Sequence, residues 1–273
     1  MISQANRILA EFKNLGADIK IVENGYNFFI SENSNLEFNG ELPDYCIYLD
    51  KDKYFGEILQ KLGVKTFNPI SSILDCDDKM LTYLKLNKSG IKIPKTIPSP
   101  LCYSNEEISL NESQKIVDTL SLPVVMKLSF SSLGKGVFKA DNLNELNELM
   151  NKYKYDAKIY QSYISSSFGK DVRVICIGGK YVCSFMRTSN GKDFRSNAAI
   201  GGSGVLIETP KSFIKVAEKV AKILKLDYMG IDLLFDENNE PIVCEVNSNA
   251  FFCGFDICHF FNTPLTFNDL KHS

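Results

Sequence analysis

The residues that could do chemistry in this chain are mainly carboxylates, lysines, arginines and backbone groups. Only two histidines occur among 273 residues, His259 and His272. A Ser–His–Asp or Cys–His mechanism would therefore depend on these two side chains, and on His259 above all. The same count excludes a histidine-rich metal site.

Two acidic residues near the end of the sequence have the spacing of a metal site. Residues 230–235 and 241–246 are typical of the two strands of a hairpin, and we expect the turn to centre on Asn238 and Asn239. In this register one face is apolar, with the pairs Phe235–Ile242, Leu233–Cys244 and Ile231–Val246.

On the other face of the predicted hairpin, Asp232 lies opposite Glu245, and Asn247 follows on the same side. Like charges directly across a strand pair are destabilising, and a divalent cation with oxygen ligands would offset this repulsion. The pattern favours a Mg²⁺ site that keeps waters and binds phosphate. The alternative is a pair of solvated carboxylates on an exposed sheet.

A second candidate is Lys127 together with the small-residue turn at 131–137, SSLGKGV. Backbone N–H groups of such a turn can approach phosphates closely, and a lysine on the preceding strand neutralises phosphate charge. The turn is not a Walker A loop, because the spacing GxxxxGK[ST] is missing. Taken alone, it would be an ordinary hairpin turn.

Arginine is rare in this chain and is concentrated in one region. Three of the four arginines are Arg173, Arg187 and Arg195, whereas lysine supplies the other positive charges. Arginine binds carboxylate or phosphate through two parallel hydrogen bonds, which lysine cannot do. The cluster therefore indicates an anion-binding region, with surface salt bridges as the alternative. Nearby, the extended segment 161–164 could border a planar base or be a core strand.

The elements that must position these residues change in kind along the sequence. Residues 1–75 are predicted to alternate between helices (8–15 and 57–63) and strands (17–24, 45–49 and 64–68), which favours a small parallel α/β domain. A helix is expected over 77–90 with Asp77 as its N-cap, followed by an extended proline-rich linker at 91–100.

Strands dominate from about residue 123 onward. They are predicted at 123–129, 137–140 and 157–164, and as a hairpin over 171–187. Helices are expected at 141–153 and at 209–226, the second with Thr209 as N-cap and Pro210 at its first position.

The composition excludes several classes of protein. With 44% hydrophobic and 23% charged residues the chain is not a disordered one, and a net charge of −2 argues against nucleic acid as a partner. No apolar run approaches the ~20 residues of a membrane span, and no secretory signal is visible. The eight cysteines contain no CxxC pair, so we expect free thiols in a soluble, cytoplasmic protein.

Several segments, taken in order, resemble the ATP-grasp carboxylate–amine ligases, and within them the RimK-type α-L-glutamate ligases that modify ribosomal protein S6. They are LPVVMK, SSLGKGV, QSYI, DVRVICIGG, DFRSN followed by GG, GIDLL and EVN, spread over roughly residues 75–250. The resemblance implies an α/β (α+β) ATP-grasp fold. Residues 1–75 would form a leading α/β domain, and subdomains at 76–160 and 161–273 would clamp ATP between them.

The resemblance also implies a role for each matching residue. ATP phosphates would contact Lys79, Lys127, Ser131, Ser132, Gly134, Gly136 and Val137. Adenine and ribose would contact Gln161, Ser162, Tyr163, Ile164 and Asp171. Two Mg²⁺ ions, or Mn²⁺ in their place, would be held by Asp232, Glu245 and Asn247. The reacting groups would contact Arg195 and Asn197, with Arg173 and Arg187 as further anion-binding candidates.

The implied reaction needs no histidine. A substrate carboxylate attacks the γ-phosphate of ATP to give an acyl-phosphate, and an amine then displaces phosphate to give an amide. The substrates would be small, with glutamate as the model, or one would be a peptide; a homo-oligomer is plausible by analogy. A peptide-modifying ligase, a phosphotransferase and a nucleotide-binding regulator without turnover remain as alternatives.

Three positions depart from the family pattern. Ser131 replaces the usual glycine, and Ser162 replaces the usual glutamate. After EVN the sequence continues as SNAFFCGFD, 248–256, where Ser-Pro-Gly is usual. We therefore expect the substrate end of the site to be reshaped.

Overall fold

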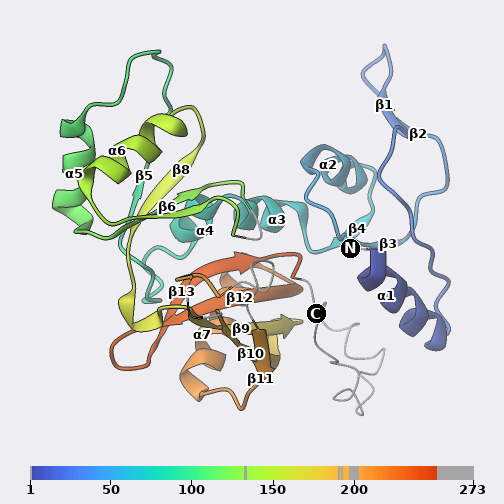
Figure 1. Ribbon diagram of the computed structural model, residues 1–273. Coiled ribbons are helices and arrows are strands. Elements are labelled where there is room, and N and C mark those ends of the chain that lie inside the picture. Colours follow the sequence, from blue (N-terminus) through green and yellow to red (C-terminus); the bar gives the residue numbers. More distant parts are fainter. Residues whose placement is uncertain (1, 132–133, 190, 192, 197–202, 251–273) are drawn as a thin grey trace.

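The structure is a computed structural model that describes residues 2–131, 134–189, 191, 193–196 and 203–250. Figure 1 shows three parts side by side: a unit of sheet and helices at the upper left, a larger sheet below it, and an N-terminal part at the right. The family's fold class predicted from the sequence, α/β with α+β units, matches this arrangement of helices and mainly antiparallel sheets.

The first unit is a four-stranded antiparallel sheet with strand order β5-β8-β6-β7. Its strands are β5 (Thr96–Pro98), β6 (Val124–Leu128), β7 (Val137–Ala140) and β8 (Lys158–Ser162). Helices α5 (Leu110–Leu120) and α6 (Leu143–Lys152) cover one face. Because side chains alternate along β6, Val124 and Met126 join this core, whereas Val125 and Lys127 point to the opposite face.

The second unit is a five-stranded antiparallel sheet with strand order β11-β10-β9-β12-β13. Its strands are β9 (Lys170–Ile177), β10 (Lys180–Thr188), β11 (Ser203–Leu206), β12 (Tyr228–Phe235) and β13 (Pro241–Asn247), and a one-turn 3₁₀ helix, η1 (Ser165–Ser167), precedes them. Helix α7 (Lys211–Leu224) packs on one face and forms the largest core with it.

The N-terminal part contains two small sheets. Strands β3 (Tyr45–Ile47) and β4 (Lys65–Phe67) are parallel, whereas β1 (Phe28–Ile30) and β2 (Leu36–Phe38) form an antiparallel hairpin. The helices are α1 (Ile2–Asn14), α2 (Lys53–Lys61), α3 (Ile70–Asp77) and α4 (Lys79–Lys85). Ile70 and Ile73 of α3 lie in the N-terminal core, whereas Cys76 near its end and Leu86 after α4 lie in the core under the five-stranded sheet, so α3 packs against both parts. The boundary after residue 75 stays a prediction.

Four local predictions from the sequence are wrong. Residues 17–24 form no strand, and Ile21 and Val22 are exposed, since a strand needs a neighbour with which to pair. Asp78, not Asp77, caps α4. Thr209 does not cap α7; its hydroxyl contacts Tyr181 and Ser184 instead, and Pro210 occupies the cap position.

The fourth error concerns the linker. The segment 91–100 contains strand β5, which pairs with β8.

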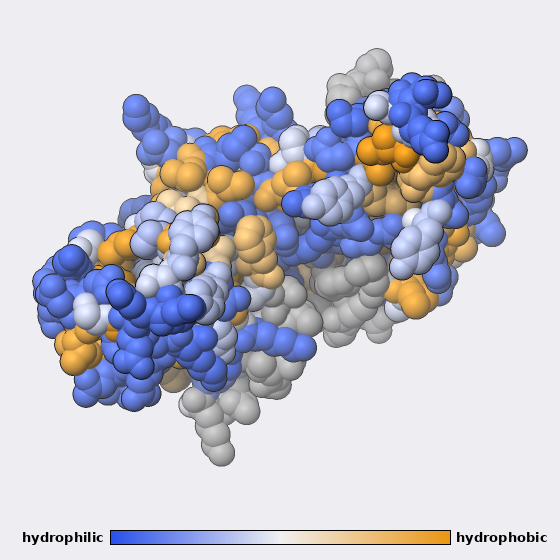
Figure 2. Space-filling view, turned by 90° about the horizontal axis from the view of Figure 1, so that it is seen from above, coloured by the Kyte–Doolittle hydropathy of each residue, from blue (hydrophilic) through white to orange (hydrophobic). Residues whose placement is uncertain are grey.

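In the described part of the chain no helix is long and apolar enough to cross a membrane. The face seen in Figure 2 is mostly hydrophilic, with apolar residues in separate patches.

Candidate active site

A cleft with about 830 Å³ of empty space, part of it at the open mouth, lies between the two large sheets. The start of α4 also contributes to its walls. Most of the residues that the sequence singles out converge on it: Lys79, Lys127, Ser131, Gly134, Val137, Gln161, Ser162, Tyr163, Ile164, Asp171, Arg187, Arg195, Asp232 and Glu245. Arg173, Gly136 and Asn247 lie outside its lining. Ser132 and Asn197 lie outside the described residues.

The hairpin β12–β13 carries the acidic residues, and its register is partly the predicted one. Asp232 pairs with Glu245 and Ile231 with Val246 as expected. The register then shifts by one residue, so Leu233 pairs with Val243 and Phe235 with Pro241. The predicted pairs Leu233–Cys244 and Phe235–Ile242 are therefore wrong.

The shift is a β-bulge, and Cys244 is its extra residue. As a result Cys244 and Glu245 both line the cleft, while Val243 and Val246 on either side of them are buried in the core. The hydroxyl of Tyr83, from α4, donates a 2.6 Å hydrogen bond to the Cys244 carbonyl and so fixes the bulge. The predicted register places Cys244 on the apolar core face, and the bulge instead brings it into the site.

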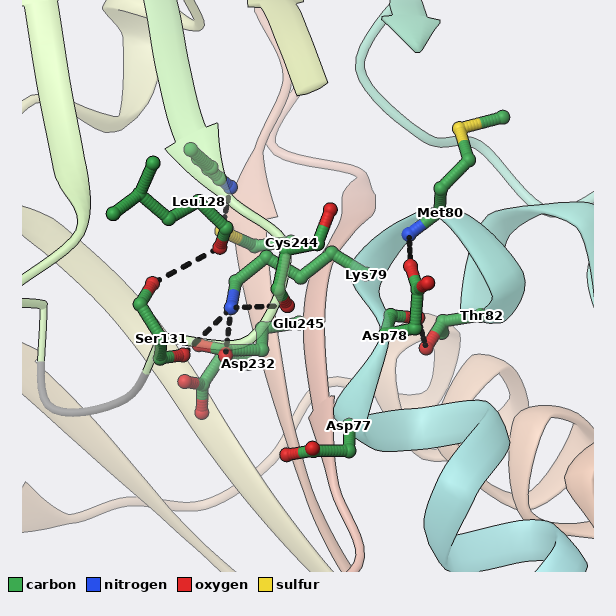
Figure 3. Close-up of polar contacts among 12 residues, drawn as sticks. Asp77, Asp78, Lys79, Met80, Thr82, Leu128, Ser131, Asp232, Cys244 and Glu245 are labelled. Atoms are coloured by element: carbon green, nitrogen blue, oxygen red, sulfur yellow. Dashed lines mark hydrogen bonds and ion pairs between the residues drawn. The ribbon is translucent and has the colours of Figure 1, made fainter. Parts of the chain in front are cut away.

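Lys79 begins α4, where Asp78 accepts the first free amides of the helix. Its ammonium donates to the carbonyl of Ser131 at 2.7 Å and lies 3.5 Å from Oε1 of Glu245 (Figure 3). Burial lowers the pKa of Lys79, and the charge of Glu245 opposes that shift. Lys79 therefore joins the turn of one sheet to the acidic strand of the other.

Lys127 projects from β6 into the same cleft and is 7% exposed. Its ammonium lies 3.4 Å from Sγ of Cys244. Among the described residues, no carboxylate oxygen is found within the 4 Å ion-pair distance of this ammonium. A buried cation with such surroundings is costly unless an anion completes them.

A row of alternating charges across three strands forms the floor of the cleft, to which Asp171, Arg187 and Asp232 belong, and continues beyond the lining to Arg173. Arg173 on β9 faces Asp232 on β12 and donates to both of its carboxylate oxygens, at 2.7 and 2.8 Å. Arg187 on β10 faces Asp171 on β9 and holds it the same way, at 2.6 and 2.5 Å. Arg187 also lies 2.8 Å from Asp232 and therefore links the two pairs.

This row sets the protonation of its acids. Burial by itself would raise the pKa of Asp232, but the guanidiniums of Arg173 and Arg187 lower it to about 2. Burial raises the pKa of Asp171, and Arg187 opposes the shift. Both oxygens of Asp171 are taken by Arg187, and one of them also accepts the hydroxyl of Ser196. Asp171 thus holds other side chains of the floor.

Arg195 crosses from the five-stranded sheet to the small-residue turn. One amino group donates to the carbonyl of Gly134 at 2.6 Å and lies 3.3 Å from that of Val137. The rest of its guanidinium is paired with Asp193. The arginine that the sequence assigns to the reacting groups therefore holds the turn of the opposite unit.

An aromatic wall borders the other end of the cleft. Tyr163 follows β8, and its ring meets that of Phe194 edge-on at a centroid distance of 6.1 Å. The ammonium of Lys139 lies 5.6 Å from the Tyr163 ring centroid. The side-chain amide of Gln161 donates a hydrogen bond to the hydroxyl of Thr96, within the sheet. Phe194 was not singled out from the sequence, although it lies inside the DFRSN motif.

Asn247 ends β13 opposite Gly230. Its buried Nδ2 has no hydrogen-bond partner among the described residues, and the same holds for Oγ of Ser248. No cluster of three or more His, Cys, Asp or Glu side chains suited to a metal occurs in the described part of the chain. A metal here would thus depend on two carboxylates and an amide.

Comparisons with known proteins show the family of this chain. The RimK-like ATP-grasp domain model matches residues 76–259. N-acetylaspartylglutamate synthase A of Homo sapiens is 32% identical over 219 residues, which cover 79% of this chain and 54% of that protein. Glutamate--LysW ligase ArgX of Sulfurisphaera tokodaii is 30% identical over 232 residues, covering 81% and 79%. This chain therefore spans about half the length of the human relative.

Solved structures support the fold. D-alanine--D-alanine ligase from Bacillus anthracis, complexed with ATP, gives a TM-score of 0.60 at 21% identity, covering 76% of this chain and 68% of that one. The ATP-grasp ligase PsnB, complexed with a precursor variant, Mg and ADP, gives 0.55 at 16%, covering 74% and 60%.

The match to the ATP-grasp domain model, together with two sheet units that face each other across a cleft, defines an ATP-grasp protein. The chain belongs to the RimK-like ATP-grasp family, as its sequence motifs predict.

Proposed function

We propose that this chain is an ATP- and Mg²⁺-dependent ligase that activates a carboxylate as an acyl-phosphate and joins it to an amine. The observation that carries the proposal is Lys127, a buried ammonium at the centre of the cleft that lacks a carboxylate at ion-pair distance in the described structure. A polyphosphate would supply the missing negative charge. Lys79 lies on the same cleft and is available to the same anion once it leaves the Ser131 carbonyl.

The acidic strand pair fits a magnesium ion. Asp232, Glu245 and Asn247 offer oxygen donors, which Mg²⁺ prefers, and Mg²⁺ normally completes its shell with water and phosphate. In the structure the negative charges of the two acids are balanced by Arg173, Arg187 and Lys79. Bound there, the ion would neutralise charge on the β- and γ-phosphates. Two ions, and replacement by Mn²⁺, belong to the proposal.

The chain's own residues would do the rest. The adenine ring would pack against the aromatic wall at Tyr163 and Phe194, and the triphosphate would then point toward Lys127. The carboxylate oxygen of the substrate forms a bond to the γ-phosphorus while the bond to the β–γ bridging oxygen breaks, which releases ADP. The amine then adds to the acyl carbon, and Arg195 would turn from its present partners, Asp193 and Gly134, to stabilise the oxyanion before phosphate leaves.

The relatives indicate the substrate class. Their names describe the attachment of glutamate to another molecule, so we propose glutamate as the amine that this chain uses. The carboxylate partner is a small acid or a peptide. A cytoplasmic location, a homo-oligomer and the three-part division at 75 and 160 belong to the same proposal.

The test is phosphate release from ATP and Mg²⁺ over a panel of amino acids and small acids, singly and in pairs. We expect release of phosphate and ADP only when one carboxylate and one amine are present together. ADP formed with a carboxylate alone, without an amine and without release of free phosphate, would instead indicate a phosphotransferase. ATP binding without turnover on any pair, including peptides, would favour a regulatory protein and contradict the proposal.

A further inference from the structure

Ser196 is attached to the charged floor of the cleft by a single side-chain contact. Its hydroxyl donates a 2.5 Å hydrogen bond to Oδ2 of Asp171, and Ser196 is 4% exposed. An O–H donor on a carboxylate is among the stronger hydrogen bonds in proteins. Asp171 is anchored in turn by Arg187, which continues to Asp232. Ser196 therefore connects its segment to the strand that carries the acidic residues.

The segment 193–196 spans the space between the two units. On the side of the five-stranded sheet it is held by Ser196 and by the carbonyl of Phe194, which accepts the amide of Gly169 at 3.0 Å. On the other side Arg195 reaches the carbonyls of Gly134 and Val137. Arg195 can hold the turn in place only as firmly as its own segment is held.

The charge of Asp171 does not require Ser196. Arg187 already binds both oxygens of this carboxylate, so loss of the hydroxyl leaves the ion pair intact. Removing the hydroxyl should therefore loosen the segment without unfolding the sheet beneath it. The contact is therefore better explained by the segment 193–196, which it positions, than by a contribution to the stability of the sheet.

We propose that Ser196 is a positioning residue: its bond to Asp171 fixes the segment 193–196 so that Arg195 keeps its contacts with the carbonyls of Gly134 and Val137 at the cleft. The expected effect of Ser196 on the use of ATP rests on the function proposed above. The expected effect on the contacts of Arg195 does not, because these contacts lie within the chain.

The first experiment uses the free protein. Lys135 is exposed between Gly134 and Gly136, so trypsin cleavage after it, followed by mass spectrometry under native conditions, reports how often residues 134–137 separate from Arg195. We expect Ser196→Ala to speed this cleavage about tenfold, as the loss of one charge-assisted hydrogen bond would. Ser196→Thr, which keeps a hydroxyl, should cleave like the unmodified chain.

Two further variants sharpen this result. Ser189→Ala removes a nearby hydroxyl that accepts from Gly191 rather than bonding to Asp171, and it should leave the cleavage rate unchanged. Arg195→Ala should speed cleavage as Ser196→Ala does, and the double variant should be no faster than Arg195→Ala alone, because Ser196 acts through Arg195. Additive effects, or an unchanged rate in Ser196→Ala, would overturn the proposal.

The second experiment measures turnover with the pair of substrates that supports phosphate release. Ser196→Ala should raise the KM for ATP about tenfold with a smaller change in kcat, and Ser196→Thr should restore it. An unchanged KM for ATP would contradict the proposed role. If the unmodified chain turns over no pair, the ligase proposal fails, whereas the cleavage experiment still decides the role of Ser196.

Discussion

At the scale of single residues, the candidate site is defined by how its charges are paired. Asp232 has both oxygens on arginine side chains, and its pKa is lowered to about 2, so it is ionised at neutral pH. Glu245 is paired more loosely, at 3.5 Å from Lys79. The ammonium of Lys127 lies 3.4 Å from the Cys244 sulfur and has no carboxylate oxygen at ion-pair distance among the described residues. A cation at the acids would therefore share their oxygens with the arginines and Lys79, whereas Lys127 would pair with an anion.

Glu245→Gln should lower Mg²⁺-dependent turnover by at least about 100-fold, because the amide keeps the shape of the side chain but loses its charge. The measurement is phosphate release as Mg²⁺ is varied, with a thermal melt to show that the fold is intact. Glu240→Gln is the matched control, since Glu240 is exposed in the turn of the same hairpin. Equal rates in the two variants would remove Glu245 from the metal site.

Arg195→Lys should weaken ATP binding about tenfold, as Ser196→Ala should, and slow amide formation about 100-fold. Lysine retains the charge but lacks the fork that contacts Asp193 and Gly134 together. Calorimetry gives the affinity for ATP, and product analysis gives the rate of amide formation. A rate like that of the unmodified chain would show that Arg195 takes no part in the reaction.

At the scale of elements, the bulge in β13 shows where prediction from the sequence ends. Alternating patterns predict both strands of the hairpin and place Asp232 opposite Glu245, although the pairing nearer the turn is one residue off the predicted register and the bulge beside Glu245 restores it. The bulge was not foreseen, since an apolar cysteine at 244 suits a core position and its anchor, Tyr83, comes from a distant helix. Tertiary contacts of this kind leave no periodic signal in the local sequence.

Two other features of the fold, the arginine contacts across the five-stranded sheet and helix α5, were also missed from the sequence. The motifs predict that the basic and acidic residues share a site, but not that Arg173 and Arg187 grip the acids, because the strand order that brings β9 beside β10 and β12 is a property of the whole sheet. Helix α5 was not predicted, although the capping box formed by Ser109 and Glu112 marks its start.

Gly230→Ala should lower the free energy of unfolding by about 1–3 kcal/mol. An added Cβ would lie 2.4 Å from Cβ of Ala250, so strand β12 or the segment after β13 must shift. Gly25→Ala is the control, because the nearest atom to its added Cβ is 3.9 Å away. Thermal melts of both variants make the comparison, and a loss no greater than that of Gly25→Ala would contradict the packing described here.

At the scale of the whole molecule, one side chain ties the N-terminal part to the acidic sheet. Asn68 follows β4 and donates to the carbonyls of Tyr228 and Ser248, at 2.7 and 2.8 Å, while its oxygen accepts the amide of Tyr228. Tyr228 is the first residue of β12, and Ser248 follows Asn247 at the end of β13. The N-terminal part thus supports the end of the strand that carries the proposed metal ligands.

Asn68→Asp should lower the free energy of unfolding by about 3 kcal/mol, because a carboxylate cannot donate to the two carbonyls and its charge would be buried. Urea unfolding measures the effect. Asn39→Asp, at an exposed position of the same part, is the control and should change little. Coincident unfolding curves for the two variants would show that Asn68 is not the tie described here.

The central claim is that a carboxylate attacks the γ-phosphate of ATP. The most direct test uses a substrate acid labelled with ¹⁸O in both carboxylate oxygens, together with the amine that supports turnover. If an acyl-phosphate forms, one labelled oxygen must leave with inorganic phosphate and one must stay in the amide, which mass spectrometry can measure. Unlabelled phosphate, or label in AMP, would contradict the account.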